Sequence, residues 1–306
     1  MNAGFMHHHR RSMSRAPSLR LWIAGARPRT LPAAVVPVAL GAAVAVDDDS
    51  GWSSVSWAGI VLALVVSLLL QVGVNYANDY SDGVRGTDDV RVGPLRLVAS
   101  GSATPQQVRA AALTSLLLAS VAGCALAAMT SWWLIAVGVA AVLAAWGYTG
   151  GPKPYGYLGL GEVFVFVFFG LVATVGTTFA AVEQLLWRSW VAGAGVGALA
   201  CALLVVNNLR DLPTDRDVNK RTLAVRLGDA RTRVMFTTLV VAALASSVAI
   251  ADLGALIALV VAVPALSVVR MIHSGVVGAE LIPVLGSTGK LQLLFGVLLS
   301  VGLVIM

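Results

Sequence analysis

Long apolar runs separated by short polar stretches dominate the chain. A helix needs about 20 mostly apolar residues to cross the hydrocarbon layer of a bilayer, and the chain holds nine runs of roughly that length. They lack the alternation of polar and apolar positions that is typical of barrel strands. We therefore predict an all-α membrane protein whose nine transmembrane helices cover residues 22–46, 55–77, 107–128, 132–149, 158–182, 190–208, 232–251, 253–272 and 282–306.

The composition agrees with this pattern and excludes two other classes of protein. Hydrophobic residues make up 58% of the 306 residues and charged residues 12%, about half the charged fraction of an average soluble chain. Such a chain cannot cover itself with polar surface, which excludes a soluble globular domain, and it is too apolar for a disordered protein. Cys124 and Cys201 stand alone in apolar runs, so we expect neither a disulfide framework nor a zinc site.

The two ends of the chain differ in character. Residues 1–20 are polar and include three consecutive histidines at 7–9, which we interpret as a solvated cytoplasmic tail or the remnant of an expression tag rather than a metal site. No short apolar segment with a small-residue cleavage site follows, so we predict no signal peptide. Residues 21–306 are expected to form a single transmembrane domain.

The positions of the basic residues predict the orientation. All 21 Lys and Arg residues except Arg188 and Lys290 lie before the first predicted span or close to the cytoplasmic ends of the others. Basic residues collect in cytoplasmic loops, so we expect the N-terminus in the cytoplasm, the C-terminus outside and the protein in the cytoplasmic membrane. The net charge of +6 then reports topology, and no nucleic-acid partner is expected.

Two of the predicted helices end in similar polar sequences on the cytoplasmic side. Asn75 and Asp79, at the end of the second span, match Asn207 and Asp211, at the end of the sixth, at one common offset of 132 residues. We interpret the match as a duplication that gives two pseudo-repeated four-helix halves plus a ninth helix. The polar residues of the two ends are Asn75, Asn78, Asp79, Asp82, Asn207, Asp211 and Asp215.

These two ends favour a metal site. Residues three or four apart share a helix face, so each end presents a stripe of carboxylates and amides, provided that the second helix continues past Pro213. A single aspartate at the end of a span is usually just solvated, but two matched stripes on one side of the membrane are not explained that way. Oxygen ligands without thiolates or imidazoles suit Mg2+, which combines a few carboxylates with substrate phosphates.

Basic side chains near the same mouth favour a phosphate-bearing substrate. Arginine holds phosphate oxygens with a planar fork and lysine acts as a point charge. The connection 148–156 is rich in Gly and Pro and is either a phosphate cradle or only a tight turn. Glu162, just inside the fifth span, is expected to avoid lipid, and its role is open. The basic candidates are Arg85, Arg96, Lys153, Lys220 and Arg221.

Both acidic ends resemble the aspartate-rich motifs of the UbiA superfamily of intramembrane prenyltransferases. The first motif corresponds to residues 78–82 (NDYSD) and the second to residues 211–215 (DLPTD). The family pattern has a third acid where this chain has Gly86. Asp88 or Asp89 could replace it from the loop, so their ligand roles, and that of Asp217, stay open.

Further stretches narrow the resemblance to the branch of the superfamily that acts on 1,4-dihydroxy-2-naphthoate. The resemblance covers about residues 21–306. The stretches that carry it are 26–32, 93–101 and 148–156.

The resemblance implies an enzyme with a central cavity capped by cytoplasmic loops. It would transfer a polyprenyl chain from polyprenyl diphosphate to 1,4-dihydroxy-2-naphthoate, releasing diphosphate and CO2 and forming demethylmenaquinone in menaquinone biosynthesis. Mg2+ is the implied cofactor and the lipid bilayer the implied surroundings. No obligate protein partner is implied.

The resemblance also implies residue roles. The catalytic and metal-binding residues would be Asp79, Asp82, Asp211 and Asp215. The diphosphate would be bound by Asn75, Asn78, Arg96, Tyr148, Lys153, Asn207, Lys220 and Arg221. The acceptor would be bound by Arg29 and Glu162, although Arg29 could instead anchor the first helix.

Three other functions remain open at this point. A superfamily relative could use another aromatic acceptor, such as 4-hydroxybenzoate or homogentisate. A membrane transporter would also have repeats and intramembrane carboxylates, but tends to place them near the bilayer midplane on broken helices. A non-enzymatic scaffold would leave the paired acidic ends unexplained.

Overall fold

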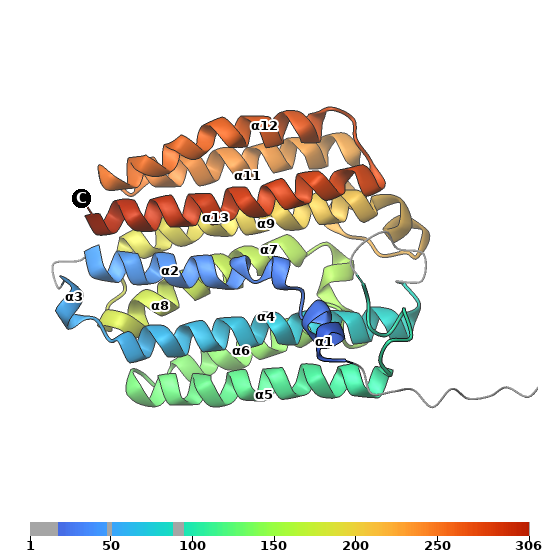
Figure 1. Ribbon diagram of the computed structural model, residues 1–306, viewed down its shortest axis with the longest axis horizontal. Coiled ribbons are helices and arrows are strands. Elements are labelled where there is room, and N and C mark those ends of the chain that lie inside the picture. Colours follow the sequence, from blue (N-terminus) through green and yellow to red (C-terminus); the bar gives the residue numbers. More distant parts are fainter. Residues whose placement is uncertain (1–17, 48–50, 88–94, 306) are drawn as a thin grey trace, which may run out of the picture.

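The computed structural model describes residues 18–47, 51–87 and 95–305. Figure 1 shows them as an elongated bundle of helices that run roughly side by side, and every regular element in the described residues is helical. The predicted all-α class is therefore confirmed. Asp88 and Asp89, for which a ligand role was left open, lie outside the described residues, as do the three histidines at 7–9.

The helices follow the apolar runs in order. They are α1 (Leu19–Gly25), η1 (Pro28–Thr30), α2 (Pro32–Asp47), α3 (Gly51–Ser54), α4 (Trp57–Arg85), α5 (Pro105–Met129), α6 (Leu134–Gly147), η2 (Tyr155–Leu158), α7 (Gly161–Val165), the π-helix η3 (Phe166–Val172), α8 (Ala173–Val182), α9 (Trp187–Asp217), α10 (Leu223–Leu227), α11 (Asp229–Ala249), η4 (Gly254–Val261), α12 (Ala262–His273), η5 (Gly278–Glu280) and α13 (Leu281–Ile305).

Length and composition make this an integral, multi-pass membrane protein. Within the described residues, seven helices are long and apolar enough to cross a membrane, or eight if the bent pair Leu19–Thr30 and Pro32–Asp47 forms one span. The remaining long apolar helix, α6, has 14 residues and is shorter than a full crossing requires. The structure therefore gives seven or eight candidate spans, and the count of nine stays a prediction.

The first predicted span, 22–46, is bent rather than one straight helix, so whether it makes one crossing stays a prediction. The segment Leu19–Thr30 meets α2 at an angle of 53°. Arg27 takes a left-handed backbone conformation (φ 54°), and Pro28 follows it directly. Proline lacks an N–H group and disfavours a helical conformation in the residue before it, which explains why the helix breaks at this point.

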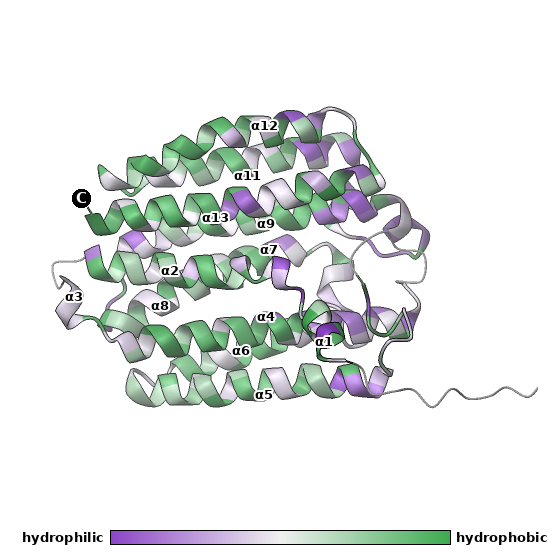
Figure 2. Ribbon diagram, viewed as in Figure 1, coloured by the Kyte–Doolittle hydropathy of each residue, from purple (hydrophilic) through white to green (hydrophobic). Residues whose placement is uncertain are grey.

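The two helices that carry the acidic sequences extend well beyond their apolar parts. α4 has 29 residues and α9 has 31, which corresponds to about 43 and 46 Å, more than the ~30 Å of bilayer hydrocarbon. α9 continues through Pro213 without ending. Both acidic ends lie at the end of the bundle where hydrophilic residues gather, opposite the end that carries the C-terminus (Figures 1 and 2).

The two helices differ in how deeply they lie in the bundle. The largest apolar core packs α9 with α2, α11, η4, α12 and α13 around Leu40, Leu199, Phe236 and Phe295. α4 packs mainly on α5. In the most apolar 18 residues of each helix, 72% of α9 is buried but only 28% of α4. α9 is therefore the central helix, and α4 lies at the periphery.

Two glycines bring the fifth apolar segment against α9. The π-helix η3 interrupts this segment between α7 and α8, as π-bulges often do near functional sites. A Cβ at Gly170 would lie 2.7 Å from the Cα of Gly197, so glycine is needed for the backbones to meet. This contact fixes α7 beside the polar end of α9.

Candidate active site

Backbone groups hold the first aspartate of α4. Asp79 is 1% exposed, and its carboxylate accepts hydrogen bonds from the N–H groups of Leu97 (2.7 Å) and Val98 (3.0 Å). Gly83, one turn further along α4, allows this approach, since a Cβ there would lie 2.6 Å from the Val98 Cβ. Arg27, at the bend after α1, acts electrostatically on the same carboxylate. The loop after α4 therefore fixes the orientation of Asp79.

A phenol holds the second aspartate of α4. The Tyr157 hydroxyl donates to Asp82 Oδ1 at 2.8 Å, and an Arg96 guanidinium nitrogen lies 3.8 Å from Asp82 Oδ2. Asp82 and Arg96 are both buried. Burial raises the pKa of Tyr157, and the Asp82 carboxylate raises it further, because both disfavour the phenolate. The Tyr157 hydroxyl therefore stays protonated and donates a hydrogen bond to Asp82.

Tyr157 also reaches the second acidic end. Its ring lies between two cations: the Arg85 guanidinium carbon is 5.4 Å from the ring centroid and Lys220 Nζ is 5.2 Å from it, both within cation–π range. Lys220 Nζ in turn lies 3.5 Å from Asp215 Oδ1. One side chain thus links Asp82 on α4 to the cation that pairs with Asp215 on α9.

Charged donors hold the aspartates of α9. Arg210 Nε and one terminal nitrogen donate to the two oxygens of Asp211 at 2.7 and 2.8 Å. Both side chains are buried. Asp215 pairs with Lys220 as described above, whereas Asp217, the last residue of the helix, is exposed. The second motif therefore carries its own cations.

The asparagines have dissimilar partners. Asn75 donates to the Ala26 carbonyl (2.9 Å) and to Thr30 Oγ1 (3.0 Å), which ties α4 to the bend after α1. Asn78 accepts a 2.7 Å hydrogen bond from Thr149 Oγ1. Asn207 is half-buried, and its side chain makes no hydrogen bond within the described residues. The common offset of Asn75 and Asn207 therefore does not correspond to matching contacts.

Glu162 lies between the two acidic ends. It is 5% exposed, and its Oε1 accepts a 3.0 Å hydrogen bond from Asn208 Nδ2, while its buried Oε2 has no hydrogen-bond partner within the described residues. The carboxylates of Glu162, Asp82 and Asp215 all act electrostatically on the Tyr148 hydroxyl. Tyr148 thus lies within electrostatic range of both motifs and of Glu162.

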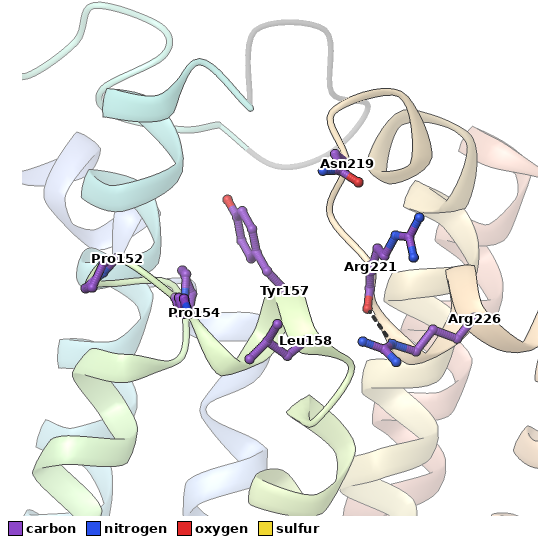
Figure 3. A pocket seen from close by; sticks show the side chains of 8 residues that line it. Pro152, Pro154, Tyr157, Leu158, Asn219, Arg221 and Arg226 are labelled. Carbon is purple, nitrogen blue, oxygen red and sulfur yellow. Dashed lines mark hydrogen bonds between the residues drawn. The ribbon is translucent and has the colours of Figure 1, made fainter.

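The other predicted residues lie further out. Arg29 is exposed on η1. Lys153 and Arg221 line a pocket of about 380 Å³ beside the aspartates, shown in Figure 3. None of the four motif aspartates lines this pocket, which is bounded by Pro152, Lys153, Pro154, Tyr157, Leu158, Asn219, Arg221 and Arg226.

The donor set fits a divalent metal that is completed by substrate. Within the described ranges, no three His, Cys, Asp or Glu side chains gather closely enough to hold an ion by themselves. Mg2+ commonly binds one or two carboxylates and fills its other positions with water and substrate phosphates. Two pairs of buried carboxylates beside buried cations suit that kind of site, in which metal and diphosphate bind together.

Sequence reasoning missed two of these contacts. Tyr157 follows the predicted cradle 148–156 by one residue, and its position in a Gly- and Pro-rich connection between the two motifs was the available signal. Arg210 was counted only for topology. Adjacent residues of a helix do not normally face each other, so no spacing rule could pair it with Asp211.

Together these features define a multi-pass, all-helical membrane protein with buried carboxylates and cations at one end. The pattern of the UbiA prenyltransferase family matches residues 34–278, about four-fifths of the chain, and the chain belongs to this family. Membership favours an enzyme over the transporter and the scaffold that the sequence left open.

Curated relatives match most of the chain. The 1,4-dihydroxy-2-naphthoate octaprenyltransferase of Mycobacterium tuberculosis is 50% identical over 281 residues, which cover 91% of this chain and 94% of that protein. The enzyme of the same name from Escherichia coli is 37% identical over 225 residues, 69% of this chain and 70% of that protein.

Solved structures share the fold. A UbiA homologue from Archaeoglobus fulgidus bound to DMAPP and Mg2+ superposes with a TM-score of 0.63 at 15% identity, covering 92% of this chain and 99% of that one. The apo UbiA homologue from Aeropyrum pernix K1 gives a TM-score of 0.67, also at 15% identity, covering 94% and 98%. At this identity the likeness concerns the fold.

Proposed function

We propose that this protein transfers a polyprenyl chain from polyprenyl diphosphate to 1,4-dihydroxy-2-naphthoate, with loss of CO2 and diphosphate, to give demethylmenaquinone. The observation that carries the proposal is 50% identity, over nine-tenths of both chains, to an enzyme named for this acceptor. The contacts that join the two acidic ends, from Asp82 through Tyr157 and Lys220 to Asp215, support it, because they put both motifs beside one place where a diphosphate can bind.

We further propose nine crossings in a single domain of residues 21–306: two four-helix halves plus α13, with the bent α1–α2 segment and the short α6 each completing one crossing. α1 and the C-terminal end of α13 lie at opposite ends of the bundle (Figure 1), which supports an odd number of crossings. The basic residues support a cytoplasmic location for the acidic end, in the cell membrane, with the C-terminus outside.

Diphosphate departure is the step that the aspartates and cations serve. Breaking the allylic carbon–oxygen bond adds charge to the diphosphate, and Mg2+ bound to Asp79, Asp82, Asp211 and Asp215 supplies Lewis-acid neutralisation of that charge. Arg96 and Lys220 add positive donors that are already in place. The contacts from Leu97, Tyr157 and Arg210 hold three of these carboxylates, so little reorganisation is needed when substrate binds.

The remaining predicted diphosphate residues shape the same mouth. Asn75 and Asn78 tie α4 to the bend and to the 148–156 connection, and Tyr148 lies between the motifs. Asn207 is half-buried one turn before Asp211, and its side-chain amide is available to bind the diphosphate. Lys153 and Arg221 line the neighbouring pocket, from which their charges attract an anionic substrate.

The acceptor must reach the freed allylic carbon inside an apolar bundle. Its electron-rich ring carbon forms the new carbon–carbon bond, and loss of the carboxylate as CO2 restores aromaticity. Glu162 has a buried carboxylate oxygen to receive a naphthol hydroxyl hydrogen, and Asn208 orients the group. Arg29, at the bend after α1, is a candidate for holding the acceptor's carboxylate. The surrounding Ala, Val and Leu side chains exclude water from the allylic cation.

To test this proposal, membranes that contain the protein are incubated with polyprenyl diphosphate, Mg2+ and one of two acceptors, 1,4-dihydroxy-2-naphthoate or 4-hydroxybenzoate. We expect demethylmenaquinone from the naphthoate, detected by mass spectrometry, and no prenylated product without Mg2+. Product from 4-hydroxybenzoate but not from the naphthoate would assign the protein to another acceptor. Membranes from cells without the protein serve as the control.

A further inference from the structure

The pocket in Figure 3, called the mouth pocket here, is separate from the aspartates. Tyr157 is shared between the two, because its ring lines the pocket while its hydroxyl donates to Asp82. The pocket volume of about 380 Å³ falls within the usual ~300–1,000 Å³ range of small-molecule sites. Its lining residues come from two connections, one on each side.

The two sides of the mouth pocket have opposite character. Pro152, Pro154, Tyr157 and Leu158, from the connection between α6 and α7, form an apolar side. Asn219, Arg221 and Arg226, from the connection after α9 and from α10, form a polar and cationic side that faces it across the gap in Figure 3. Lys153 adds a further positive charge to the lining.

The cationic side is held in place. Arg226 Nε donates to the Arg221 carbonyl at 3.2 Å, the dashed line in Figure 3. Arg226 also packs over Gly159, where φ is +73° and a Cβ would lie 3.0 Å from Arg226 Nε. Across the residues that the structure describes, no carboxylate pairs with Lys153, Arg221 or Arg226. Three positive charges thus line one pocket, and none of its lining residues is an acid.

We infer that the mouth pocket is the docking site of the aromatic carboxylate acceptor. The inference rests on the proposed function and adds to it an entry site, which the acceptor occupies before its carboxylate reaches Arg29. An aromatic acid matches both sides, because its rings can lie on the prolines, Leu158 and the Tyr157 ring while its carboxylate meets the guanidinium groups. A diphosphate has no apolar surface and would gain nothing from the apolar side. A polyprenyl tail is apolar and partitions into lipid, not into a charged opening.

The location gives the two substrates separate entrances. The acceptor is a charged, water-soluble acid and enters at the polar end of the bundle, while the polyprenyl chain is held among apolar helices. Leu158, at the edge of the pocket, is four residues before the buried Glu162, and Tyr157 separates the pocket from Asp82. An acid docked here therefore lies against Tyr157, whose hydroxyl donates to Asp82 of the first motif.

The test measures binding of 1-hydroxy-2-naphthoate to the purified full-length protein in detergent, with Arg226→Gln and the matched control Arg231→Gln. Arg231 is an exposed arginine of α11 outside the pocket. We expect Arg226→Gln to weaken binding roughly 10- to 100-fold, the usual effect of losing a hydrogen bond to a charged group. The KM for 1,4-dihydroxy-2-naphthoate should rise by a similar factor, while kcat, the KM for polyprenyl diphosphate and the thermal midpoint stay unchanged.

A second variant tests the apolar side independently. Leu158 is 47% exposed, so Leu158→Gln should fold normally, and it should weaken 1-hydroxy-2-naphthoate binding while leaving inhibition by inorganic diphosphate unchanged. Unaltered naphthoate binding in Arg226→Gln, or a rise in the KM for polyprenyl diphosphate instead, would overturn the assignment. So would an effect of Arg226→Gln without any effect of Leu158→Gln. Failure of the wild type to form demethylmenaquinone would instead remove the proposed function.

Discussion

The two acidic ends share a sequence pattern but are held in different ways. On α4, the hydrogen bonds to Asp79 and Asp82 come from uncharged donors, namely two backbone N–H groups and a phenol. On α9, Asp211 is bound by a guanidinium group and Asp215 lies beside an ammonium group. All four aspartates are buried, so each end needs partners for its carboxylates, and the two ends meet this need with different donors.

A repeated motif therefore locates the aspartates along each helix, while the surrounding segments decide which groups neutralise them. The α4 end depends on donors from the loops, with Arg96 at 3.8 Å from Asp82 as a more distant cation, whereas the α9 end depends on shorter-range pairing with Arg210 and Lys220. Substitutions at the two ends should therefore impair the protein in different ways.

Asp79→Asn and Asp211→Asn should each reduce turnover roughly 10²- to 10³-fold or more, as loss of a preorganised electrostatic group does. Only Asp211→Asn should also reduce stability strongly, by about 3–5 kcal/mol, because it leaves a buried guanidinium group without its bidentate partner. Turnover assays and thermal unfolding in detergent measure the two effects. Arg210→Met combined with Asp211→Asn should recover stability but not activity; equal destabilisation by both aspartate variants would contradict the comparison.

Tyr157→Phe should raise the KM for polyprenyl diphosphate and for Mg2+ roughly 10- to 100-fold, since it removes a hydrogen bond to a charged group. Steady-state kinetics at varied Mg2+ measure this. Tyr155→Phe is the matched control from the same connection, because the Tyr155 hydroxyl donates to the Ala144 carbonyl at 2.8 Å, away from the aspartates. Identical KM values in the two variants would show that Tyr157 does not link the two ends.

Gly83→Ala should lower activity by about tenfold and stability by about 1–3 kcal/mol, the usual cost of inserting a methyl group into a packed contact. The new Cβ would displace Val98 and pull the backbone donors away from Asp79. Gly123→Ala in α5, where a Cβ meets nothing within 4 Å, is the control and should be neutral or slightly stabilising. Full activity in Gly83→Ala would mean that the loop does not orient Asp79.

Arg188→Gln should have the smallest effect. Arg188 pairs with Asp47 at 2.5 Å and with Asp252 at 3.5 Å at the end of the bundle opposite the aspartates, but its side chain is 32% exposed. Partly exposed pairs contribute about 0–1 kcal/mol, so the thermal midpoint should fall slightly and turnover should not change. A large loss of turnover would show that the two ends of the bundle are coupled.

The sequence predicts much of this architecture and less of the site. Apolar run lengths locate the helices, and the three- and four-residue spacing of Asp79, Asp82, Asp211 and Asp215 correctly puts each pair on one helix, because both signals are local. The bend at Arg27 was missed although the polar stretch 27–30 (RPRT) interrupts the apolar run there, because the run was judged by its total length and not by its proline. The donors Leu97 and Tyr157 were missed because such contacts depend on how distant segments meet.

The asparagines show the same limit. The sequence match favoured Asn207, yet its neighbour Asn208 is the residue that contacts Glu162. One residue is 100° of rotation on a helix, and only the packing of α7 on α9 decides which of the two faces Glu162. Matching positions in a repeat therefore predict location along a helix better than they predict partners.

The Gly170–Gly197 contact has a consequence for how this protein can vary. Because no side chain separates the two backbones, a larger residue at either position must push the helices apart, and the gap would be transmitted along α7 to Glu162. A substitution two helical turns from the chemistry could thus impair the enzyme while every reacting group stayed intact. Loss-of-function variants at such glycines would be misread if only the polar residues were inspected.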